Sequence, residues 1–375
     1  MQTNVSSDTS SPAKRNRRAG KTLGVVSGIR GMIVSGQWRP GSQLPAWDAL
    51  ESRFGVARST LTQAMNNLKR DGFIYSSSTR GTFVSERPPH LSRYAVAFRG
   101  RPGTPGWVRF WSALANEVPQ HAGHPDYELA VFYDVAGSNP SEAHEALLQQ
   151  VREDRFAGIV FVGYPPEISD ELMNHPWLAK VAITRDPSRQ DIPRVFPDRG
   201  SFVRRSLERV RAMGGRRLAV VTNGLPDFAD YDRLAGEHGL ELRPHFRVGA
   251  SLSDPDSARH IVRLMLDRPA ERRPDSLIIT DDNLTESALA GAIDAGVSLP
   301  DDLRVLAHCN WPIGTRTSLP IVRLGFDARD VLRQAIDRVE SQRHGRPIPD
   351  RDVAVPAVFE SELPGPAAAE VSAGF

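Results

Sequence analysis

Apolar residues near the N-terminus recur with helical spacing and predict a small helical unit over residues 21–86. One face of its first helix carries four such residues: Leu23, Val26, Ile29 and Ile33. Gly and Pro between 36 and 41 end this helix, and a glycine follows each of the next two. The later elements are predicted in this order: helices over about 46–54 and 58–70, then β-prone runs at 73–75 and 82–84. The unit therefore contains three helices and a hairpin.

From Tyr94 onward, short β-branched or apolar runs alternate with amphipathic stretches. The runs predict strands over 95–98, 128–132, 158–162, 181–184, 218–222, 277–280 and 305–307. The stretches between them predict helices over 107–121, 140–153, 199–213, 227–238, 254–267, 283–295 and 327–343. Such alternation is typical of parallel sheets with helices on both faces. Because residues 94–363 exceed one typical doubly wound domain, we expect an α/β body of two lobes.

The segments that flank these two units have little apolar content. Residues 1–20 are rich in Ser and Thr and end in a basic run, so we expect a disordered arm that either contacts DNA phosphates or has no role. Residues 87–93 contain consecutive prolines and predict a stiff linker. Residues 364–375 are expected to form a flexible tail.

Charge is distributed unevenly along the 375 residues. Residues 1–93 contain 14 Lys and Arg against 5 Asp and Glu, whereas the remainder contains 33 against 40. A basic head on an acidic body is typical of a nucleic-acid-binding module attached to another domain. A basic segment can also merely aid solubility.

The sequence lacks the motifs of several functional classes. No apolar run reaches the roughly 20 residues of a membrane span, and the N-terminus has no secretory signal, so a cytoplasmic protein without membrane attachment is expected. Cys309 is the single cysteine, and His121 and His124 lie in a predicted loop, so we expect no disulfide and no metal site. Neither a phosphate-binding loop nor a nucleophile elbow is present, and we expect no cofactor and no enzymatic activity.

Several short motifs follow one another along residues 33–84. Among them are Pro40-Gly41-Ser42-Gln43-Leu44-Pro45, Asp71-Gly72-Phe73-Ile74 and Arg80-Gly81-Thr82-Phe83-Val84. In this order they resemble the winged helix-turn-helix domain of the GntR family of bacterial regulators. The sequence departs from the family at Ala46 and Ala57, where members usually have Ser, and at Asp48 and Thr62, where they usually have Arg. These changes remove helix caps and phosphate contacts, so the operator of a relative does not transfer to this chain.

The resemblance implies that residues 58–70 form a recognition helix whose first turns enter the major groove of DNA. Arg58 can make a bidentate contact with guanine. Polar residues of the same helix are expected to hydrogen-bond bases or phosphates: Ser59, Thr60, Thr62 and Gln63. Ser59 and Thr60 could instead only satisfy backbone donors at the helix start. In the wing, DNA contacts are expected from Arg80, Gly81 and Thr82.

A second set of motifs lies in the body and is clearest in its C-terminal half, over 157–161, 213–221, 274–282, 288–292 and 295–305. These residues resemble the effector domain shared by LacI-type repressors and periplasmic sugar-binding proteins. The resemblance implies two doubly wound lobes joined by crossing strands, with a ligand cleft at the carboxyl ends of the strands. A GntR-type head on such a body is the arrangement of regulators similar to the arabinose repressor AraR.

Ligand candidates are the residues that directly follow the predicted strands. Asp282 matches the family's acidic residue that accepts hydrogen bonds from sugar hydroxyls, although it could instead cap the next helix. Trp107 and Trp311 are candidates to stack on a sugar face, or are core aromatic residues. Comparable loops contain Arg109, Tyr164, Arg185, Asn223 and Asn310. The arginine that members usually carry after the 218–222 strand has no clear equivalent.

Together these features predict a sequence-specific transcriptional regulator, expected to be a homodimeric repressor. Its partners would be a palindromic double-stranded DNA operator and a carbohydrate effector bound between the lobes. By linkage, DNA and effector would alter each other's affinity. The alternative is a cytosolic solute-binding protein, or an enzyme, on the same scaffold with a vestigial head.

Overall fold

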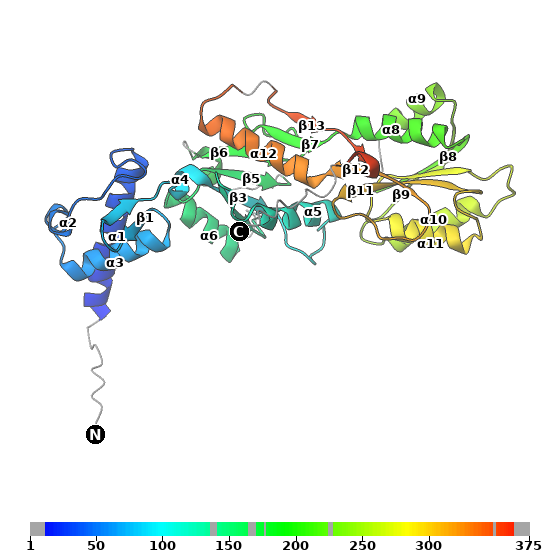
Figure 1. Ribbon diagram of the computed structural model, residues 1–375. Helices are drawn as coiled ribbons and strands as arrows, with labels where there is room; N and C mark the ends of the chain where they lie inside the picture. Colours follow the sequence, from blue (N-terminus) through cyan, green and yellow to red (C-terminus); the bar gives the residue numbers. More distant parts are fainter. Residues whose placement is uncertain are drawn as a thin grey trace, which may run out of the picture.

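The computed structural model describes residues 12–135, 141–163, 170–175, 178–223, 228–347 and 350–363. Figure 1 shows a small N-terminal head beside a longer body built from two lobes. None of the helices in the described part of the chain combines the length and the apolar content that crossing a membrane requires.

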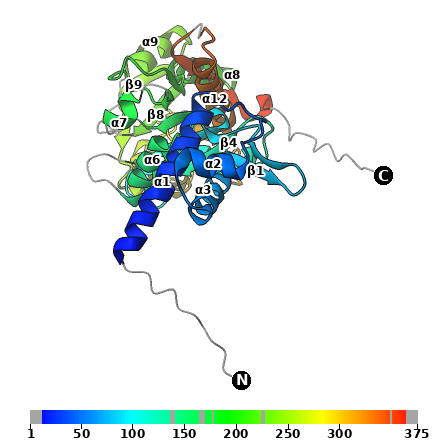
Figure 2. The same cartoon turned by 90° about the vertical axis from the view of Figure 1, so that its left-hand side faces the viewer.

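The head contains three helices and an antiparallel hairpin: α1 Pro12–Val34, α2 Trp47–Phe54, α3 Arg58–Arg70, β1 Ile74–Ser77 and β2 Gly81–Val84. Its core is formed by apolar residues that recur at helical spacing, among them Ile29, Ile33, Leu50, Leu61, Met65 and Leu68. Gly28 lets α1 approach α2 closely, because a Cβ there would lie 2.6 Å from the ring of Phe54. Since α1 begins at Pro12, residues 12–20 are helical, and the prediction of a disordered arm there is wrong (Figure 2). Residues 1–11 lie outside the described residues.

The joint between head and body is packed. It contains the short helix α4 Pro89–Ser92, and Pro88 and Pro89 are buried. The ring of His90 stacks on Phe73 of the head with centroids 6.0 Å apart. The Nη1 of Arg30, which is 8% exposed, donates to the backbone oxygen of Glu153 in the body at 2.8 Å. The stiff linker predicted over 87–93 is therefore a short helix held between two packed surfaces.

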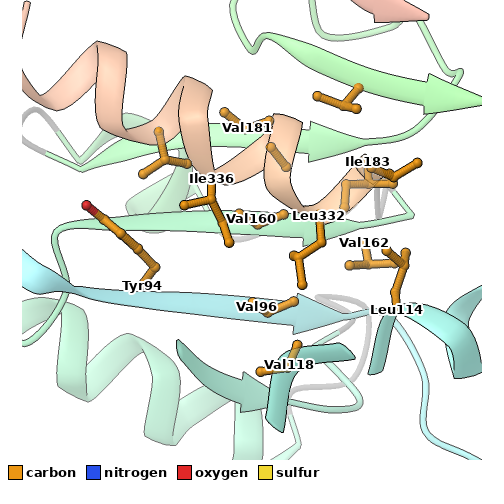
Figure 3. Close-up of a cluster of buried hydrophobic side chains, with 14 of the residues drawn as sticks. Tyr94, Val96, Leu114, Val118, Val160, Val162, Val181, Ile183, Leu332 and Ile336 are labelled. Atoms are coloured by element: carbon orange, nitrogen blue, oxygen red, sulfur yellow. The ribbon is translucent and has the colours of Figure 1, made fainter. Parts of the chain in front are cut away.

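The first lobe has a fully parallel sheet in the order β13-β7-β6-β5-β3-β4. Its strands are β3 Arg93–Phe98, β4 Glu128–Phe132, β5 Gly158–Val162, β6 Ala179–Ile183, β7 Arg194–Pro197 and β13 Val353–Val355. One face is covered by α5 Arg109–Glu117, the 3₁₀ turn Val118–His121 and α12 Ala328–Arg343. Figure 3 shows Leu332 and Ile336 of α12 among Val181, Val160 and Val96 of the sheet. The opposite face is covered by α6 Glu142–Arg152 and α7 Asp170–Asn174.

The second lobe repeats this plan with the order β14-β12-β11-β10-β8-β9, in which only β14 is antiparallel. Its strands are β8 Arg217–Asn223, β9 Glu241–Ala250, β10 Ser276–Ile279, β11 Arg304–Trp311, β12 Val322–Asp327 and β14 Val358–Phe359. The helices α8 Arg199–Ala212 and α9 Ala229–Glu237 cover one face, and α10 Asp256–Leu266 and α11 Thr285–Asp294 cover the other. A 3₁₀ turn, Glu360–Glu362, follows β14.

The chain crosses between the lobes at three places: from β7 to α8, from β12 to α12, and from β13 to β14. The predicted α/β architecture with two lobes is confirmed. The strands predicted over 128–132 and 158–162 have the observed bounds of β4 and β5. The pattern missed β7, β9, β12, β13 and β14. The first three contain Pro, Arg or Gly where an apolar run was sought, and the last two are only three and two residues long.

Candidate functional site

The recognition helix α3 has one buried and one exposed face. Its buried face carries Thr60, Leu61, Ala64, Met65 and Leu68. Thr60 is only 6% exposed, which leaves its hydroxyl little access to a DNA groove. Ser59, Thr62 and Gln63 are exposed, and the hydroxyl of Thr62 donates to the backbone oxygen of Arg58 at 2.8 Å. The α3 residues available to a groove are therefore Arg58, Ser59, Thr62 and Gln63.

Arg58 begins α3 and is held by two acidic residues of α2. Its Nη1 lies 3.3 Å from Asp48 Oδ1 and 3.0 Å from Glu51 Oε1. Its guanidinium also lies over the ring of Trp47, 4.6 Å from the centroid. We call Asp48 and Glu51 the acidic pair. The acidic pair compensates the positive charge of Arg58. The sequence did not predict these contacts.

The wing is a tight turn between β1 and β2. Gly81 has φ +104°, and a Cβ there would lie 2.9 Å from the side-chain nitrogen of Gln43. That nitrogen donates to the backbone oxygen of Arg80 at 2.8 Å, which fixes the turn while the side chain of Arg80 stays exposed. Thr82 is half-buried and its hydroxyl lies 3.0 Å from that of Ser76. The wing therefore exposes the side chain of Arg80 next to a turn whose backbone conformation requires glycine at position 81.

Between the two lobes lies a cavity of about 610 Å³. Strand ends and helix starts of both lobes line it, as expected at the carboxyl edges of parallel sheets. Four of the predicted ligand residues line the cavity: Asp282, Arg185, Asn223 and Asn310. This size and this position are typical of a site for a small molecule.

Asp282 is the most buried acidic residue of the cavity wall, at 1% exposed. Its Oδ2 accepts a hydrogen bond from Asn310 Nδ2 at 2.9 Å. No described residue donates to its Oδ1, although His308 Nδ1 lies 3.8 Å away and is likewise without a hydrogen bond among the described residues. Thr222 Oγ1 is a third buried atom of this kind on the same wall. Buried polar atoms are almost always hydrogen-bonded, so these three atoms indicate where a ligand would bind.

The neighbouring Asp281 is already saturated by protein donors. Its carboxylate accepts from Asn223 Nδ2 at 2.5 Å and from the backbone and side-chain nitrogens of Asn283 at 2.9 and 2.6 Å. Asp281 therefore organises the loop after β10 and leaves Asp282 to face the cavity. The predicted alternative, that Asp282 caps the following helix, has no hydrogen bond to support it among the described residues.

Trp111 at the start of α5 lines the first lobe's side of the cavity. It lies against Gly163, which has φ +68° and where a Cβ would lie 2.8 Å from Trp111 Cζ2. Phe202 and Phe326 line the opposite side and contact the ring of His308. The cavity thus has apolar faces between its polar groups, a combination suited to the faces of a sugar ring.

Three predicted ligand residues lie elsewhere. Trp107 packs against Phe98 and donates its indole N–H to Ser112 at 2.7 Å, so it belongs to the core. Trp311 is 4% exposed and donates to the backbone oxygen of Val358 at 3.3 Å. Arg109 bridges the lobes through an ion pair with Glu286 at 2.9 Å. Tyr164 lies outside the described residues.

Sequence reasoning missed several cavity residues: Trp111, Thr222, His308, Arg199, Tyr231 and Phe202. Two kinds of signal could have found them. Thr222 and His308 lie inside strands, within a few residues of the carboxyl end, and Arg199 begins a helix that follows a strand. Trp111 is one helical turn after Trp107, and only the start of α5 at Arg109 decides which of the two indoles faces the cleft.

Comparison with known proteins matches both parts of the chain. The gntR family of bacterial regulatory proteins matches residues 21–84, and the periplasmic binding protein-like domain matches residues 208–360. The chain is 22% identical over 340 residues to the arabinose metabolism transcriptional repressor of Geobacillus stearothermophilus, covering 85% of this chain and 92% of that protein. It is 23% identical over 322 residues to the transcriptional repressor PurR of Erwinia tasmaniensis, covering 78% and 89%.

Among solved structures, a regulatory protein of the LacI family from Chloroflexus aggregans matches the body. Its TM-score is 0.57 at 18% identity, and the match covers 71% of this chain and 96% of that one, a likeness of fold. The sequence matches and the fold agree on one arrangement. The chain joins a winged helix-turn-helix head of the gntR family to a two-lobed body of the periplasmic binding protein-like kind.

Proposed function

We propose that this protein is a sequence-specific transcriptional repressor whose affinity for operator DNA is controlled by a small carbohydrate bound between its two lobes. The observation that carries the proposal is the physical connection of two sites in one chain. A gntR-family head with an exposed polar face on α3 is packed against a body that encloses a ligand-sized cavity. The relatives that span most of the chain are transcriptional repressors.

The contacts between head and body support coupling between the two sites. Arg30 of α1 donates to the backbone of Glu153, and Asp71 after α3 forms an ion pair with Arg155 at 3.5 Å. Both body residues belong to the first lobe, just after α6. A ligand that changes the angle between the lobes would therefore move the head, and with it the spacing of two heads in a dimer.

The proposal includes a homodimer on a palindromic operator, because one winged helix contacts one half-site. Leu264 of α10 and Ile293 of α11 are 68% and 59% exposed on helices that pack against each other. Large exposed apolar side chains on neighbouring helices are suited to a subunit interface. Light scattering after size-exclusion chromatography is expected to give a dimer mass that Leu264→Glu reduces.

The test of the proposed function is selection of binding sites from random double-stranded DNA by the full-length protein. We expect enrichment of a two-fold symmetric site. Arg58→Ala is expected to lose about 1–3 kcal/mol of specific binding. Arg272→Ala, an exposed residue of the second lobe, serves as the matched control and should bind normally. Recovery of unenriched sequences, or equal binding by Arg58→Ala, would contradict the proposal.

A further inference from the structure

Two arginines line the same side of the cavity. Arg185 follows β6 in the first lobe, and Arg199 is the first residue of α8 after the first crossing. Both line the cavity, and neither guanidinium forms an ion pair with any described residue. Arg194, which lies on β7 between them, is by contrast paired with Asp352 at 2.6 Å. Both guanidinium groups are therefore available to a ligand.

The two arginines influence each other. Partial burial and the charge of Arg199 both lower the pKa of Arg185, and the carboxylate of Asp198 only partly offsets them. Asp198 is itself engaged as the cap of α8, where its Oδ1 accepts from the backbone nitrogen of Ser201 at 3.1 Å. Like charges held close together are stabilised when an anion binds between them. The start of the 14-residue α8 adds further positive potential at this point.

The wall contributed by the second lobe has the opposite character. The unpartnered Oδ1 of Asp282 is an acceptor that requires a donor, and hydroxyl groups are suitable donors. Thr222 Oγ1 and His308 Nδ1 can exchange hydrogen bonds with the same ligand. One cavity thus offers strong cationic donors on one side and an ionised acceptor on the other.

We propose that the effector is an anionic carbohydrate, whose carboxylate or phosphate is bound by Arg185 and Arg199 and whose hydroxyls donate to Asp282. This inference rests on the proposed function, because it takes the cavity as the effector site. A neutral sugar would satisfy Asp282 but would leave both guanidinium groups of the cavity with water alone. Charge-assisted bidentate pairs with arginine are among the strongest hydrogen bonds in proteins.

The inference is tested by calorimetric titration of the full-length protein with matched pairs of sugars. The anionic probes are D-glucuronate, D-galacturonate, glucose 6-phosphate and galactose 6-phosphate, and the neutral counterparts are D-glucose and D-galactose. We expect at least one anionic probe to bind about tenfold or more tightly than its neutral counterpart. Whether a hexuronate or a hexose phosphate binds distinguishes a carboxylate from a phosphate effector.

Two variants examine the role of the arginines directly. Arg185→Gln and Arg199→Gln are each expected to weaken the bound anionic sugar about tenfold, with no change for a neutral sugar. Arg272→Gln is the matched control and should leave the affinity unchanged, and circular dichroism checks that every variant is folded. Binding of no anionic probe at millimolar concentration, or equal binding by the variants, would overturn the inference.

Operator binding separates this inference from the proposed function. If a neutral sugar releases the protein from its operator and both arginine variants respond normally, the effector is not an anion but the regulator remains. If no ligand of the cavity changes operator affinity, the proposed function itself fails.

Discussion

Neutralising the acidic pair beside Arg58 is expected to strengthen operator binding. Arg58 must leave Glu51 and Asp48, at 3.0 and 3.3 Å, to reach a guanine edge in the major groove. The two carboxylates also repel the phosphates that flank the groove. Glu51→Gln and Asp48→Asn remove the charges while keeping the size and the hydrogen-bonding capacity of the side chains.

The exposure of each side chain sets the size of the effect. The side chain of Asp48 is 96% exposed, so solvent screens its ion pair and Asp48→Asn should change the operator Kd by less than about twofold. The side chain of Glu51 is 28% exposed, which places its pair near the upper end of about 1 kcal/mol for surface ion pairs. Glu51→Gln is therefore expected to tighten operator binding by about two- to fivefold.

Fluorescence anisotropy of a labelled operator at fixed salt measures these changes, because phosphate contacts make every affinity salt-dependent. In an Arg58→Ala background the gain from Glu51→Gln should largely disappear. Glu237→Gln, which removes an exposed acid paired with Arg233 on the body, is the matched control and should not alter binding. Weaker operator binding by Glu51→Gln would contradict this expectation, since it would mean that the acidic pair orients Arg58 for DNA.

Three further predictions concern the cavity wall, the joint and its histidine. Gly163→Ala should be more destabilising in urea denaturation, by about 1–3 kcal/mol, than Gly103→Ala, because both have positive φ but only Gly163 lies against Trp111; equal effects would contradict that contact. Arg30→Met should speed proteolysis between head and body, since it leaves the partly buried backbone oxygen of Glu153 without its donor, whereas Lys21→Met on the exposed side of α1 should not. Burial, with a contribution from Arg343, lowers the pKa of His90 from 6.5 to about 4, so the folded protein favours the neutral ring. The resulting contribution to the stability of the fold is complete above pH 6.5 and is lost as the pH falls toward 4. Relative to His90→Phe, the free energy of unfolding of the wild type should fall by about 1–2 kcal/mol over that range, allowing for partial solvent access. The same pH dependence of the urea midpoint in both proteins would contradict this.

The sequence pattern predicted those parts of the fold in which local periodicity and tertiary burial agree. Strands β4 and β5 are short apolar runs, and the helices of the head repeat apolar residues on one face. Strand β9 lies at the edge of its sheet and contains Pro244, so its pattern is that of a loop. In β12, Gly325 is required because a side chain there would collide with the backbone of Cys309, a constraint visible only after the strands pair.

The candidate site was predictable only where position along the chain determines position in space. Asp282 and Arg185 follow strands and Asn223 ends β8, and all three line the cavity, as residues at carboxyl ends of parallel strands do. Trp107 and Trp111 are four residues apart, and the start of α5 at Arg109 determines which indole reaches the cleft. The contacts of the acidic pair with Arg58, and the placing of Arg185 and Arg199 in one cavity, depend on how separate elements pack, which the periodicity of the sequence does not show.

In the proposed regulator, a sugar bound in the cavity through Asp282 controls operator affinity. The most direct measurement is anisotropy of a labelled operator, titrated with the anionic sugar that binds the cavity, for the wild type and for Asp282→Asn. The account predicts that the two proteins bind the operator equally without sugar and that the sugar releases only the wild type. Release of Asp282→Asn at the same sugar concentration as the wild type would contradict it.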